Sequence, residues 1–477
     1  MTDINMDEHL IYCAGRFIDT DDTFSVINPY NNEVVSKTYL ADDESLEKAI
    51  EAAVNVQSDF AAWPSYKKSE SLRYISDRLD KEQGTFAKII AREAAKPHKY
   101  ALGEVKRAVQ TFKVASEEAL RLPGEYLQLD WTAAGEGKEG YVKYFPRGPV
   151  AAISPFNFPL NLAVHKIAPA IAAGCPVVLK PATKTPLSTL ELAKIINDAG
   201  LPEGAVSIMP MSRKTGEKLI TDDRFKMLTF TGSPEVGWAL KSRAGKKHVA
   251  LELGGNAGVI ISPSANLEHA VKRSVFGAFA YSGQVCIHAQ RFYVHESIYD
   301  KFVEQFLKQT HSLQVGDPVS EHTDVSAMID QGNAGRVAAW IEEARQQGAK
   351  VLAGGNRQNT YVEPTVLTNT KNTMNVCAKE IFGPVVSIEK YVDFQEAITA
   401  VNDSKYGLQA GIFTDSLSEM NAAHNLLEVG GVIINDVPTF RVDHMPYGGV
   451  KDSGTGREGV KYTIREMMEP RILVKNK

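Results

Sequence analysis

The sequence predicts an α/β fold built around parallel sheets, and three observations predict it. From Val150 onward, short apolar runs that suit buried strands alternate with longer stretches of helical periodicity. A second rhythm of the same kind begins near residue 254 and continues to about residue 433. The chain has 477 residues, of which 43% are apolar and 23% charged, the balance of a globular protein with two large or three typical domains.

The first part of the chain is expected to be mostly helical. Residues 41–63 place apolar side chains at helical spacing behind the capping candidates Asp42 and Asp43. Two further helical stretches follow at 69–94 and 102–122, and a Pro–Gly pair ends them. Residues 139–149 then alternate apolar and polar side chains, as a half-buried strand does. Such a strand is either a projecting arm or an ordinary edge hairpin.

The alternating region begins with a strand at 150–154, a helix at 160–174 and a buried strand at 176–180. A helix at 187–202 and a short strand at 226–230 follow. This order indicates a parallel sheet with nucleotide-binding potential, although the usual GxGxxG fingerprint is absent.

Composition excludes several classes of protein. With 53 basic and 58 acidic side chains, the formal net charge of −5 argues against nucleic acid as a partner. The four cysteines lie far apart without a CxxC pair, and the 11 histidines show no ligand spacing, so no metal site is expected. The polar, acidic start does not resemble a signal peptide, and no apolar run is long enough for a membrane span. The cytoplasm is therefore the expected location.

Three residues could carry chemistry, and each has a structural alternative. Cys286 follows small and turn-forming residues, so its thiol could stand at a helix start with a lowered pKa, or it could be a buried inert cysteine. Glu252 ends an apolar strand, where a raised pKa would suit a general base, unless it is simply solvated. Asn157 could stabilise an oxyanion or bond its own turn.

Two further positions suit a phosphate-bearing ligand. In TGSPEVG, Gly232 lets the backbone approach a ligand where a strand gives way to a helix, whose N-terminus favours phosphate. Lys180, at the end of VVLK, could reach ribose hydroxyls or phosphate, or it could be merely solvated. Each of these signals is weak when taken alone.

The order of the motifs makes the set specific. Over nearly the whole chain the sequence resembles the aldehyde dehydrogenase superfamily, through collinear motifs at roughly the family's spacings: SPFNFP, KPATKTP, FTGSPEVG, LELGGN, SGQVC, EIFGPV, YGLQAGIFT and PYGGVKDSGTGREG. The loop TFRVDHMPYGG and the stretch EVKRAVQTFKVASEEALRLPGE look like the branch of lactaldehyde and non-phosphorylating glyceraldehyde-3-phosphate dehydrogenases.

The resemblance implies a covalent oxidation of a small, polar aldehyde to its carboxylate. Cys286 would attack the aldehyde, and Asn157 with the backbone N–H of Cys286 would hold the oxyanion. Hydride would pass from the thiohemiacetal to NAD or NADP, and Glu252 would activate water to hydrolyse the thioester. Two alternatives remain open. One is a coenzyme A-acylating enzyme, which often lacks this glutamate, and the other is a catalytically silent binding or structural member.

The resemblance also implies the cofactor site. Lys180 would contact the adenosine ribose, Gly232 and Ser233 the pyrophosphate, and Glu380 the nicotinamide ribose beside Phe382. The cofactor-binding residues would together be Ser154, Phe156, Lys180, Thr183, Gly232, Ser233, Leu253, Glu380 and Phe382.

Departures from the family pattern bear on specificity. Many NAD-preferring relatives have Glu at the position of Thr183, so the neutral side chain of Thr183 favours use of both cofactors. Arg213 and Lys214 could contact a cofactor phosphate, or they could be solvated surface residues. Asn256 replaces a lysine that many relatives carry.

Four residues are candidates for the substrate site by analogy. His165 and His288 would lie near the aldehyde tunnel, or they would simply pack in the core. Arg441 and His444 would meet an anionic group at the tunnel mouth, unless Arg441 pairs with Asp443 or a neighbouring subunit.

The implied architecture is a Rossmann-type cofactor domain, an α/β catalytic domain and a β oligomerisation arm. The cofactor domain would comprise residues 1–124, 148–253 and 435–461, and the catalytic domain residues 254–434. Residues 125–147 and 462–477 would form the arm of a homodimer or homotetramer.

Overall fold

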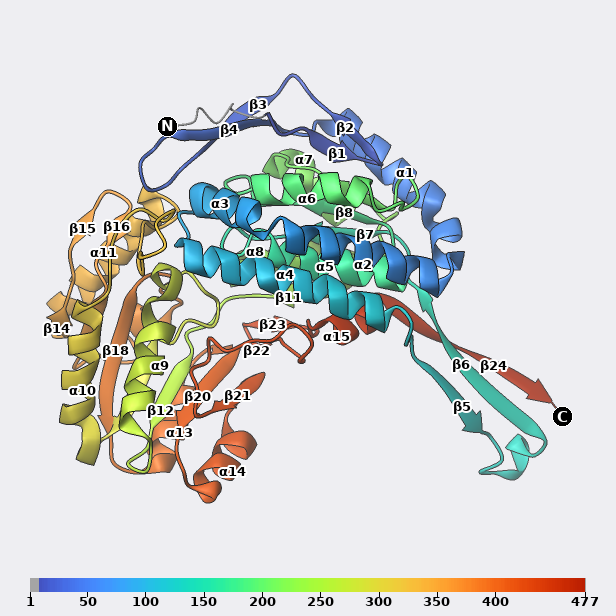
Figure 1. Ribbon diagram of the computed structural model, residues 1–477. Helices are drawn as coiled ribbons and strands as arrows, with labels where there is room; N and C mark the ends of the chain where they lie inside the picture. Colours follow the sequence, from blue (N-terminus) through green and yellow to red (C-terminus); the bar gives the residue numbers. More distant parts are fainter. Residues whose placement is uncertain (1–7, 477) are drawn as a thin grey trace.

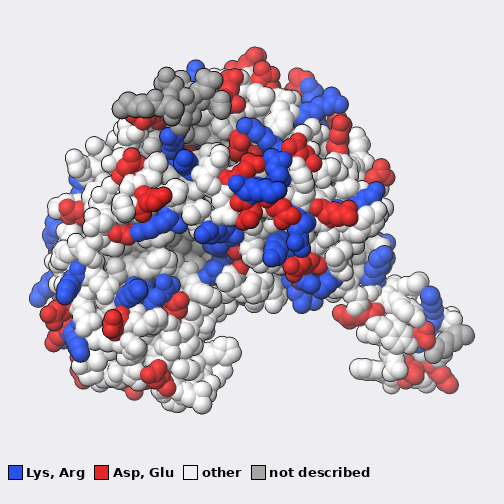
Figure 2. Space-filling model, in the orientation of Figure 1, with Lys and Arg blue, Asp and Glu red and all other residues white. Residues whose placement is uncertain are grey.

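The chain folds into two sheet-centred parts and a projecting arm (Figure 1). The computed structural model describes residues 8–476. On the face shown in Figure 2, basic and acidic side chains are intermingled over the body without a field of one sign. Among the described residues, no helix combines the length and the apolar character that crossing a membrane requires.

The first sheet has eight strands in the order β2-β1-β9-β8-β7-β10-β11-β23. Its five central strands are parallel, and the flanking β1 and β23 run antiparallel to them. The strands are β1 (Ile11–Cys13), β2 (Arg16–Ile18), β7 (Val150–Ile153), β8 (Val177–Lys180), β9 (Val206–Ile208), β10 (Met227–Thr231), β11 (His248–Glu252) and β23 (Gly454–Thr455). Apolar clusters cover both faces, which explains why β7 and β8 are continuous apolar runs.

The helices around this sheet confirm the predicted α/β rhythm. They are α1 (Asp43–Ala62), α2 (Ser65–Lys81), α3 (Gln83–Ala94), α4 (His98–Glu118), α5 (Asn161–Ala173), α6 (Leu187–Asn197), α7 (Arg213–Thr221), α8 (Pro234–Arg243) and α15 (Val460–Glu466). Asp42 caps α1 by accepting from the backbone N–H of Ser45. The helix expected at 69–94 is two helices, α2 and α3. The second ends at Ala94, and its C-cap residue Ala95, two positions before Pro97, has a left-handed backbone.

The second sheet has seven strands in the order β14-β17-β18-β13-β12-β20-β21, all parallel except β14. The strands are β12 (Gly258–Ile261), β13 (Arg291–His295), β14 (Lys350–Ala353), β17 (Thr365–Thr368), β18 (Val385–Tyr391), β20 (Gln409–Phe413) and β21 (Gly431–Ile434). Its helices are α9 (Leu267–Phe279), η2 (Ala280–Gly283), α10 (Glu296–His311), α11 (Gln331–Gln346), α12 (Asn375–Ala378), α13 (Phe394–Asn402) and α14 (Leu417–Leu426).

The predicted strand at 139–149 belongs to the arm. β6 (Lys138–Pro146) lies between β5 (Gly124–Gln128) and β24 (Met468–Asn476), and the three antiparallel strands extend away from the body (Figure 1). The remaining short elements are β3 (Thr23–Ile27), β4 (Val34–Tyr39), η1 (Ala133–Gly135), β15 (Arg357–Gln358), β16 (Tyr361–Val362), β19 (Tyr406–Gly407) and β22 (Val450–Lys451).

Candidate active site

A cavity of about 630 Å³ opens where the strand order of the first sheet reverses. The chain passes from β7 through β8 to β9 in one direction and then continues on the other side with β10 and β11. Ser154 follows β7, Gly232 follows β10, and Leu253 follows β11, so the carboxyl ends of these strands form one wall. Crevices at such reversal points bind ligands in open α/β sheets.

The wall at β10 is shaped for close approach of a ligand. A Cβ at Gly232 would lie 2.5 Å from the Phe230 ring, so only glycine fits this position without displacing the ring. Ser233 is the N-cap residue of α8, and its side chain makes no capping hydrogen bond. The hydroxyl of Ser154 is buried without a hydrogen-bond partner among the described residues. Free helix N–H groups and an unpaired hydroxyl fit a phosphorylated cofactor such as NAD or NADP.

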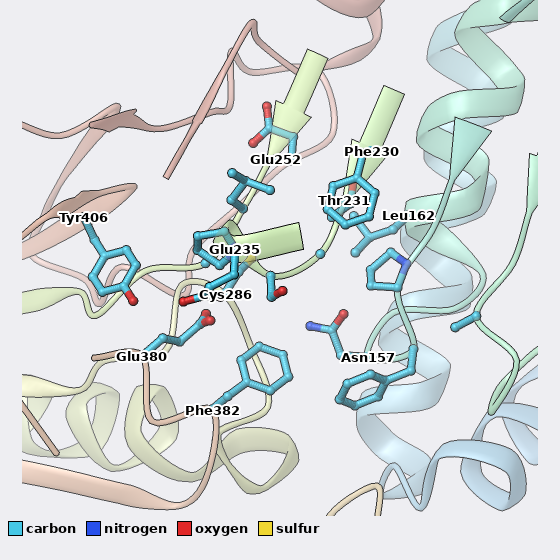
Figure 3. A pocket seen from close by; sticks show the side chains of 18 of the residues that line it. Asn157, Leu162, Phe230, Thr231, Glu235, Glu252, Cys286, Glu380, Phe382 and Tyr406 are labelled. Carbon is cyan, nitrogen blue, oxygen red and sulfur yellow. The ribbon is translucent and has the colours of Figure 1, made fainter. Parts of the chain in front are cut away.

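The opposite wall comes from the second part of the molecule. Glu380 accepts a hydrogen bond from the backbone N–H of Gly255 at 3.1 Å, and burial raises the pKa of its carboxyl group to about 8. Phe382 has a left-handed backbone and packs edge-to-face on Phe156 at 5.7 Å between ring centroids. Figure 3 shows Glu380 and Phe382 facing the cavity. These residues could hold a ribose and a flat ring.

Cys286 lies in a turn before β13, so the structure excludes one of the two settings that the sequence left open, the helix start with a lowered thiol pKa. The thiol lines the cavity, and burial raises its pKa to about 11. A hydrogen bond with Tyr447, 3.0 Å from Sγ to Oη, and the charge of Arg441 act in the opposite direction. Glu380 and Glu252 raise the pKa further.

The turn is set by an unusual segment just before it. Tyr281, Ser282 and Gly283 all have left-handed backbone angles, with φ of 50°, 53° and 67°. Tyr281 Oη donates to the carbonyl of Ala94 at 3.1 Å, and Ser282 Oγ donates to the carbonyl of Ser326 at 2.7 Å. Such conformations persist only where surrounding contacts impose them, and they cluster at functional sites.

Asn157 reaches the cavity from another side than Cys286 (Figure 3). Its side-chain amide donates to the carbonyl of Gln284 at 2.9 Å. The second N–H of the amide and the backbone N–H of Cys286 have no acceptor among the described residues. Two such donors beside a nucleophile could stabilise an oxyanion.

A buried ion pair supports the chain behind Asn157. Glu104 accepts from the backbone N–H groups of Leu160 and Asn161, at 2.9 and 3.1 Å, where α5 begins. Lys96 pairs with the same carboxylate, and both side chains are 0% exposed. The Lys96 ammonium lies 3.6 Å from the ring centroid of Phe158, the residue after Asn157, and 4.4 Å from that of Tyr281.

Glu252 ends β11 and has the raised pKa that its apolar surroundings predict. Burial is the main cause, and the charge of Glu458 adds to it. One carboxylate oxygen, Oε2, has no hydrogen-bond partner among the described residues. In Figure 3 the carboxylate is turned away from Cys286. Its other oxygen faces Gly448, where an added Cβ would come within 2.9 Å.

A buried cluster of charges lies beside these residues. Arg441 Nη2 donates to Glu458 at 3.0 Å, and its guanidinium stacks 3.7 Å from the centroid of the Tyr447 ring. The ammonium of Lys166 lies 3.3 Å from the other oxygen of Glu458. The sequence-based alternative that Arg441 pairs with Asp443 is therefore replaced by a pair with Glu458.

Asp443 instead joins three other groups. It accepts from Arg107 at 2.8 Å and from Asn161 at 3.2 Å, and it lies 2.8 Å from His165 Nε2. Burial acts to raise the pKa of Asp443, but His165 and Arg107 hold it far below its usual value. Burial lowers the pKa of His165, and the charge of Arg441 lowers it further, while Asp443 opposes the shift. Sequence reasoning missed Arg107, and it missed Tyr447 and Glu458 as individual residues of the site.

Ten of the predicted site residues line the cavity: Ser154, Phe156, Asn157, Gly232, Ser233, Glu252, Leu253, Cys286, Glu380 and Phe382. Six others do not: His165, Lys180, Thr183, His288, Arg441 and His444.

Of these six, His165 and Arg441 belong to the charge cluster described above, and the other four lie elsewhere. His288 is buried against the carbonyl of Ala278, 2.8 Å from its Nε2, which matches the packing alternative. Thr183 is exposed and borders a separate hollow, and His444 is exposed as well. Burial lowers the pKa of Lys180 to about 8, and the charge of Arg213 contributes.

Asn256, which departs from the family pattern, has a structural role. Its amide donates to the carbonyl of Cys377 at 2.7 Å and accepts from the hydroxyl of Ser404 at 2.8 Å.

Within residues 8–476, no three His, Cys, Asp or Glu side chains form a group suited to a metal ion.

Comparison with known proteins agrees with this site. The profile of the aldehyde dehydrogenase family matches residues 17–473, so the chain belongs to that family. The 3-sulfolactaldehyde dehydrogenase of Priestia aryabhattai is 42% identical over 98% of both chains. The crystal structure of aldehyde dehydrogenase 21 from Physcomitrella patens with the reaction product succinate has a TM-score of 0.98 and 45% identity, covering 99% of both chains.

A third relative fits the branch that the sequence resembles. The glyceraldehyde-3-phosphate dehydrogenase of Methanocaldococcus jannaschii, solved with NADP, has a TM-score of 0.92 and 38% identity, covering 96% of this chain and all of the other. The predicted family, branch and fold are thereby confirmed.

Proposed function

We propose that this aldehyde dehydrogenase oxidises a small aldehyde bearing an anionic group to the free carboxylate, with NAD or NADP as hydride acceptor. A cluster of charges near Cys286 carries this proposal. Among the described residues, Arg107, Arg441 and Lys166 pair with two carboxylates of low pKa, those of Asp443 and Glu458. The side chain of Arg107 is 28% exposed, and burial lowers the pKa of Lys166. An anionic substrate group would complete the pairing. The relatives act on or release sulfonate-, carboxylate- and phosphate-bearing compounds, as their names state.

In the proposed mechanism the sulfur of Cys286 forms a bond to the carbonyl carbon, and the C=O electron pair moves to oxygen. Asn157 and the backbone N–H of Cys286 hold that oxyanion. A nicotinamide held beside Glu380 and Phe382 would supply the hydride acceptor, and a thioester would then remain on Cys286. Glu252, whose raised pKa suits a general base, then takes a proton from water as the water attacks the thioester. The carboxylate of Glu252 must first rotate toward Cys286.

The covalent step has a direct test. Cys286→Ala should abolish oxidation of every aldehyde, whereas Cys13→Ala, at a buried thiol in β1 between β2 and β9, should leave the rate unchanged. Oxidation by the Cys286 variant at the original rate would rule out the covalent mechanism. An activity dependent on coenzyme A, with an acyl-CoA product, would replace the hydrolytic ending.

The substrate class is tested by nicotinamide reduction across a panel of aldehydes. Propanal and lactaldehyde represent neutral substrates, and succinate semialdehyde, 3-sulfolactaldehyde and glyceraldehyde 3-phosphate represent anionic ones. A charged hydrogen bond contributes about 1.5–3 kcal/mol, so Arg107→Met should lower kcat/KM for the preferred anion by roughly 10- to 100-fold and spare propanal. Arg121→Met, at an exposed ion pair after the same helix, is the matched control. Equal losses for neutral and anionic aldehydes would contradict the proposal.

We further propose that both NAD and NADP are used. Thr183 presents no negative charge, and the mutual repulsion of Lys180 and Arg213 would be relieved by a phosphate placed between them. Arg213→Gln should therefore lower kcat/KM for NADP and leave that for NAD nearly unchanged. Strict NAD turnover by the wild type, with no NADP activity, would contradict dual use.

We propose that the arm assembles a homodimer or homotetramer. β24 is an edge strand of nine residues, and its Ile472, Leu473 and Val474 are about half exposed. Long apolar edges are normally covered. In Figure 2 the side of the lower lobe that faces the arm across the gap carries few charged groups, which suits a partner surface. Light scattering should give a multiple of the mass of 52.3 kDa, and Leu473→Arg should reduce it. A monomeric wild type would exclude assembly.

We also retain the division into domains as a proposal. The cofactor domain comprises residues 1–124, 148–253 and 435–461, the catalytic domain residues 254–434, and the arm residues 125–147 and 462–477. The two main sheets and the arm support it, although α15 crosses the last boundary and packs on α5. The four free cysteines suit the reducing cytoplasm as the site of action.

A further inference from the structure

Tyr447 contacts the proposed nucleophile from outside the cofactor cavity. Its Oη lies 3.0 Å from Sγ of Cys286, and within the described part of the chain this is the only hydrogen bond of the hydroxyl group. The side chain is 3% exposed, so water does not compete for this contact. Because Tyr447 does not line the cavity, it leaves the cavity side of the sulfur open.

Several contacts fix the position of this hydroxyl. The backbone of Tyr447 pairs with Glu458 in both directions, with N–H to O distances of 3.0 and 2.6 Å. The guanidinium of Arg441, itself bound to Glu458, lies over the phenol ring. Burial raises the pKa of Tyr447, so the phenol keeps its proton, and the charge of Arg441 on the ring face opposes that shift.

We propose that Tyr447 is a further catalytic residue, which donates its hydroxyl hydrogen bond to the sulfur of Cys286 whenever that sulfur carries negative charge. The proposal rests on the covalent role of Cys286 proposed above. Loss of the thiol proton to solvent breaks the S–H bond, and Tyr447 keeps its own proton and stabilises the thiolate. As the C–S bond forms, the sulfur gives up its charge and the hydrogen bond weakens.

The same hydrogen bond would return at the end of the cycle. When water attacks the thioester, the C–S bond breaks and its electron pair returns to sulfur, where Tyr447 again donates. The next residue, Gly448, faces the carboxylate of Glu252, so one two-residue segment adjoins both reactive side chains. The charged or titratable groups that influence the thiol are Tyr447, Arg441, Glu380 and Glu252.

The test is the rate at which iodoacetamide alkylates Cys286 in the full-length protein, followed on its peptide by mass spectrometry between about pH 7 and pH 9. Tyr447→Phe keeps the ring but removes the donor, which should raise the thiol pKa by about one unit. The thiolate fraction then falls about tenfold while its intrinsic nucleophilicity rises about threefold, so the observed rate should fall about threefold at each pH. Tyr299→Phe, which removes a hydroxyl bonded to the carbonyl of Ile388, should leave the rate unchanged.

An alkylation rate in Tyr447→Phe equal to or above that of the wild type would overturn the proposal. If Tyr447→Phe fails to fold, replacing tyrosine by 3-fluorotyrosine in the wild-type chain supplies a stronger donor and should accelerate alkylation of Cys286. An unchanged rate there would overturn the proposal as well. Alkylation needs no aldehyde or nicotinamide, so failure of Tyr447 as a donor is distinct from failure of the proposed substrate class.

Discussion

The buried pair of Lys96 and Glu104 can be tested by replacing each partner. Glu104→Gln keeps an acceptor for the two backbone N–H groups at the start of α5 but leaves the ammonium of Lys96 unpaired and 0% exposed. Removing one partner of a buried ion pair costs about 3–5 kcal/mol of the free energy of unfolding. Lys96→Met should cost a similar amount, because it leaves the carboxylate of Glu104 unpaired.

The double variant separates pairing from packing. With both charges removed, no ion remains buried alone, so Lys96→Met with Glu104→Gln should cost about 3 kcal/mol less than the sum of the single changes. Each single change should also lower kcat by roughly tenfold or more, because the start of α5 positions Asn157. Lys48→Met, which breaks an exposed pair with Glu44, should cost below about 0.5 kcal/mol.

The assay is urea unfolding at one protein concentration, followed by tryptophan fluorescence, together with kcat at saturating aldehyde. Additive costs in the double variant would refute the coupling. Single costs under about 1 kcal/mol would refute the claim that the interior holds both charges. Lys96 itself has a pKa lowered to about 8 by burial, so the measurements are made at pH 7, where the ammonium is charged.

Three further predictions concern other parts of the site. The pKa of Glu380 is about 8 in the folded protein and near 4.5 in the unfolded chain, so the protein loses stability as pH rises from about 4.5 to about 8. Glu380→Gln should therefore raise Tm at pH 8 but hardly at pH 5, and equal gains in Tm at both pH values would contradict this. Gly283 has a φ of 67°, and a Cβ added there would lie 2.1 Å from the carbonyl oxygen of Gly383. Gly283→Ala should therefore lower the free energy of unfolding by at least about 1–3 kcal/mol and remove most of the activity. A variant with the Tm and kcat of the wild type would refute the strain. Asp443 has a depressed pKa, so the stability that its charge contributes is present above about pH 4 and is lost in acid. Asp443→Asn should have a lower free energy of unfolding in urea than the wild type at pH 7, and the difference should shrink as pH falls. A difference that stays constant with pH would count against charge pairing with Arg107.

Residues placed by local pattern could be predicted from the sequence. Ser154, Gly232 and Glu252 lie where apolar strands end, and a strand followed by a turn is visible over a few residues. Their arrival at one cavity follows from the parallel order of β7, β10 and β11. The raised pKa of Glu252 also follows from its apolar neighbours.

Residues whose setting depends on distant partners could not be predicted. The sequence left a helix start open at Cys286 because nothing near it shows that Tyr281 and Ser282 adopt left-handed backbones, which contacts with Ala94 and Ser326 hold. Tyr447 meets Cys286 across 161 positions of chain. Arg107 meets Asp443 across 336 positions. No short window of sequence contains either contact.

The segment 441–458 also has a consequence for synthesis. It carries Arg441, Tyr447 and Glu458. It also contains β23, which pairs with β11 beside Glu252 and so completes the first sheet. At 5–20 residues per second, the thiol of Cys286 is made on the order of ten seconds before Tyr447. A chain interrupted in that interval has an uncovered edge at β11 and no complete site. Chains that stop there therefore lack the complete site and expose a strand edge that favours aggregation.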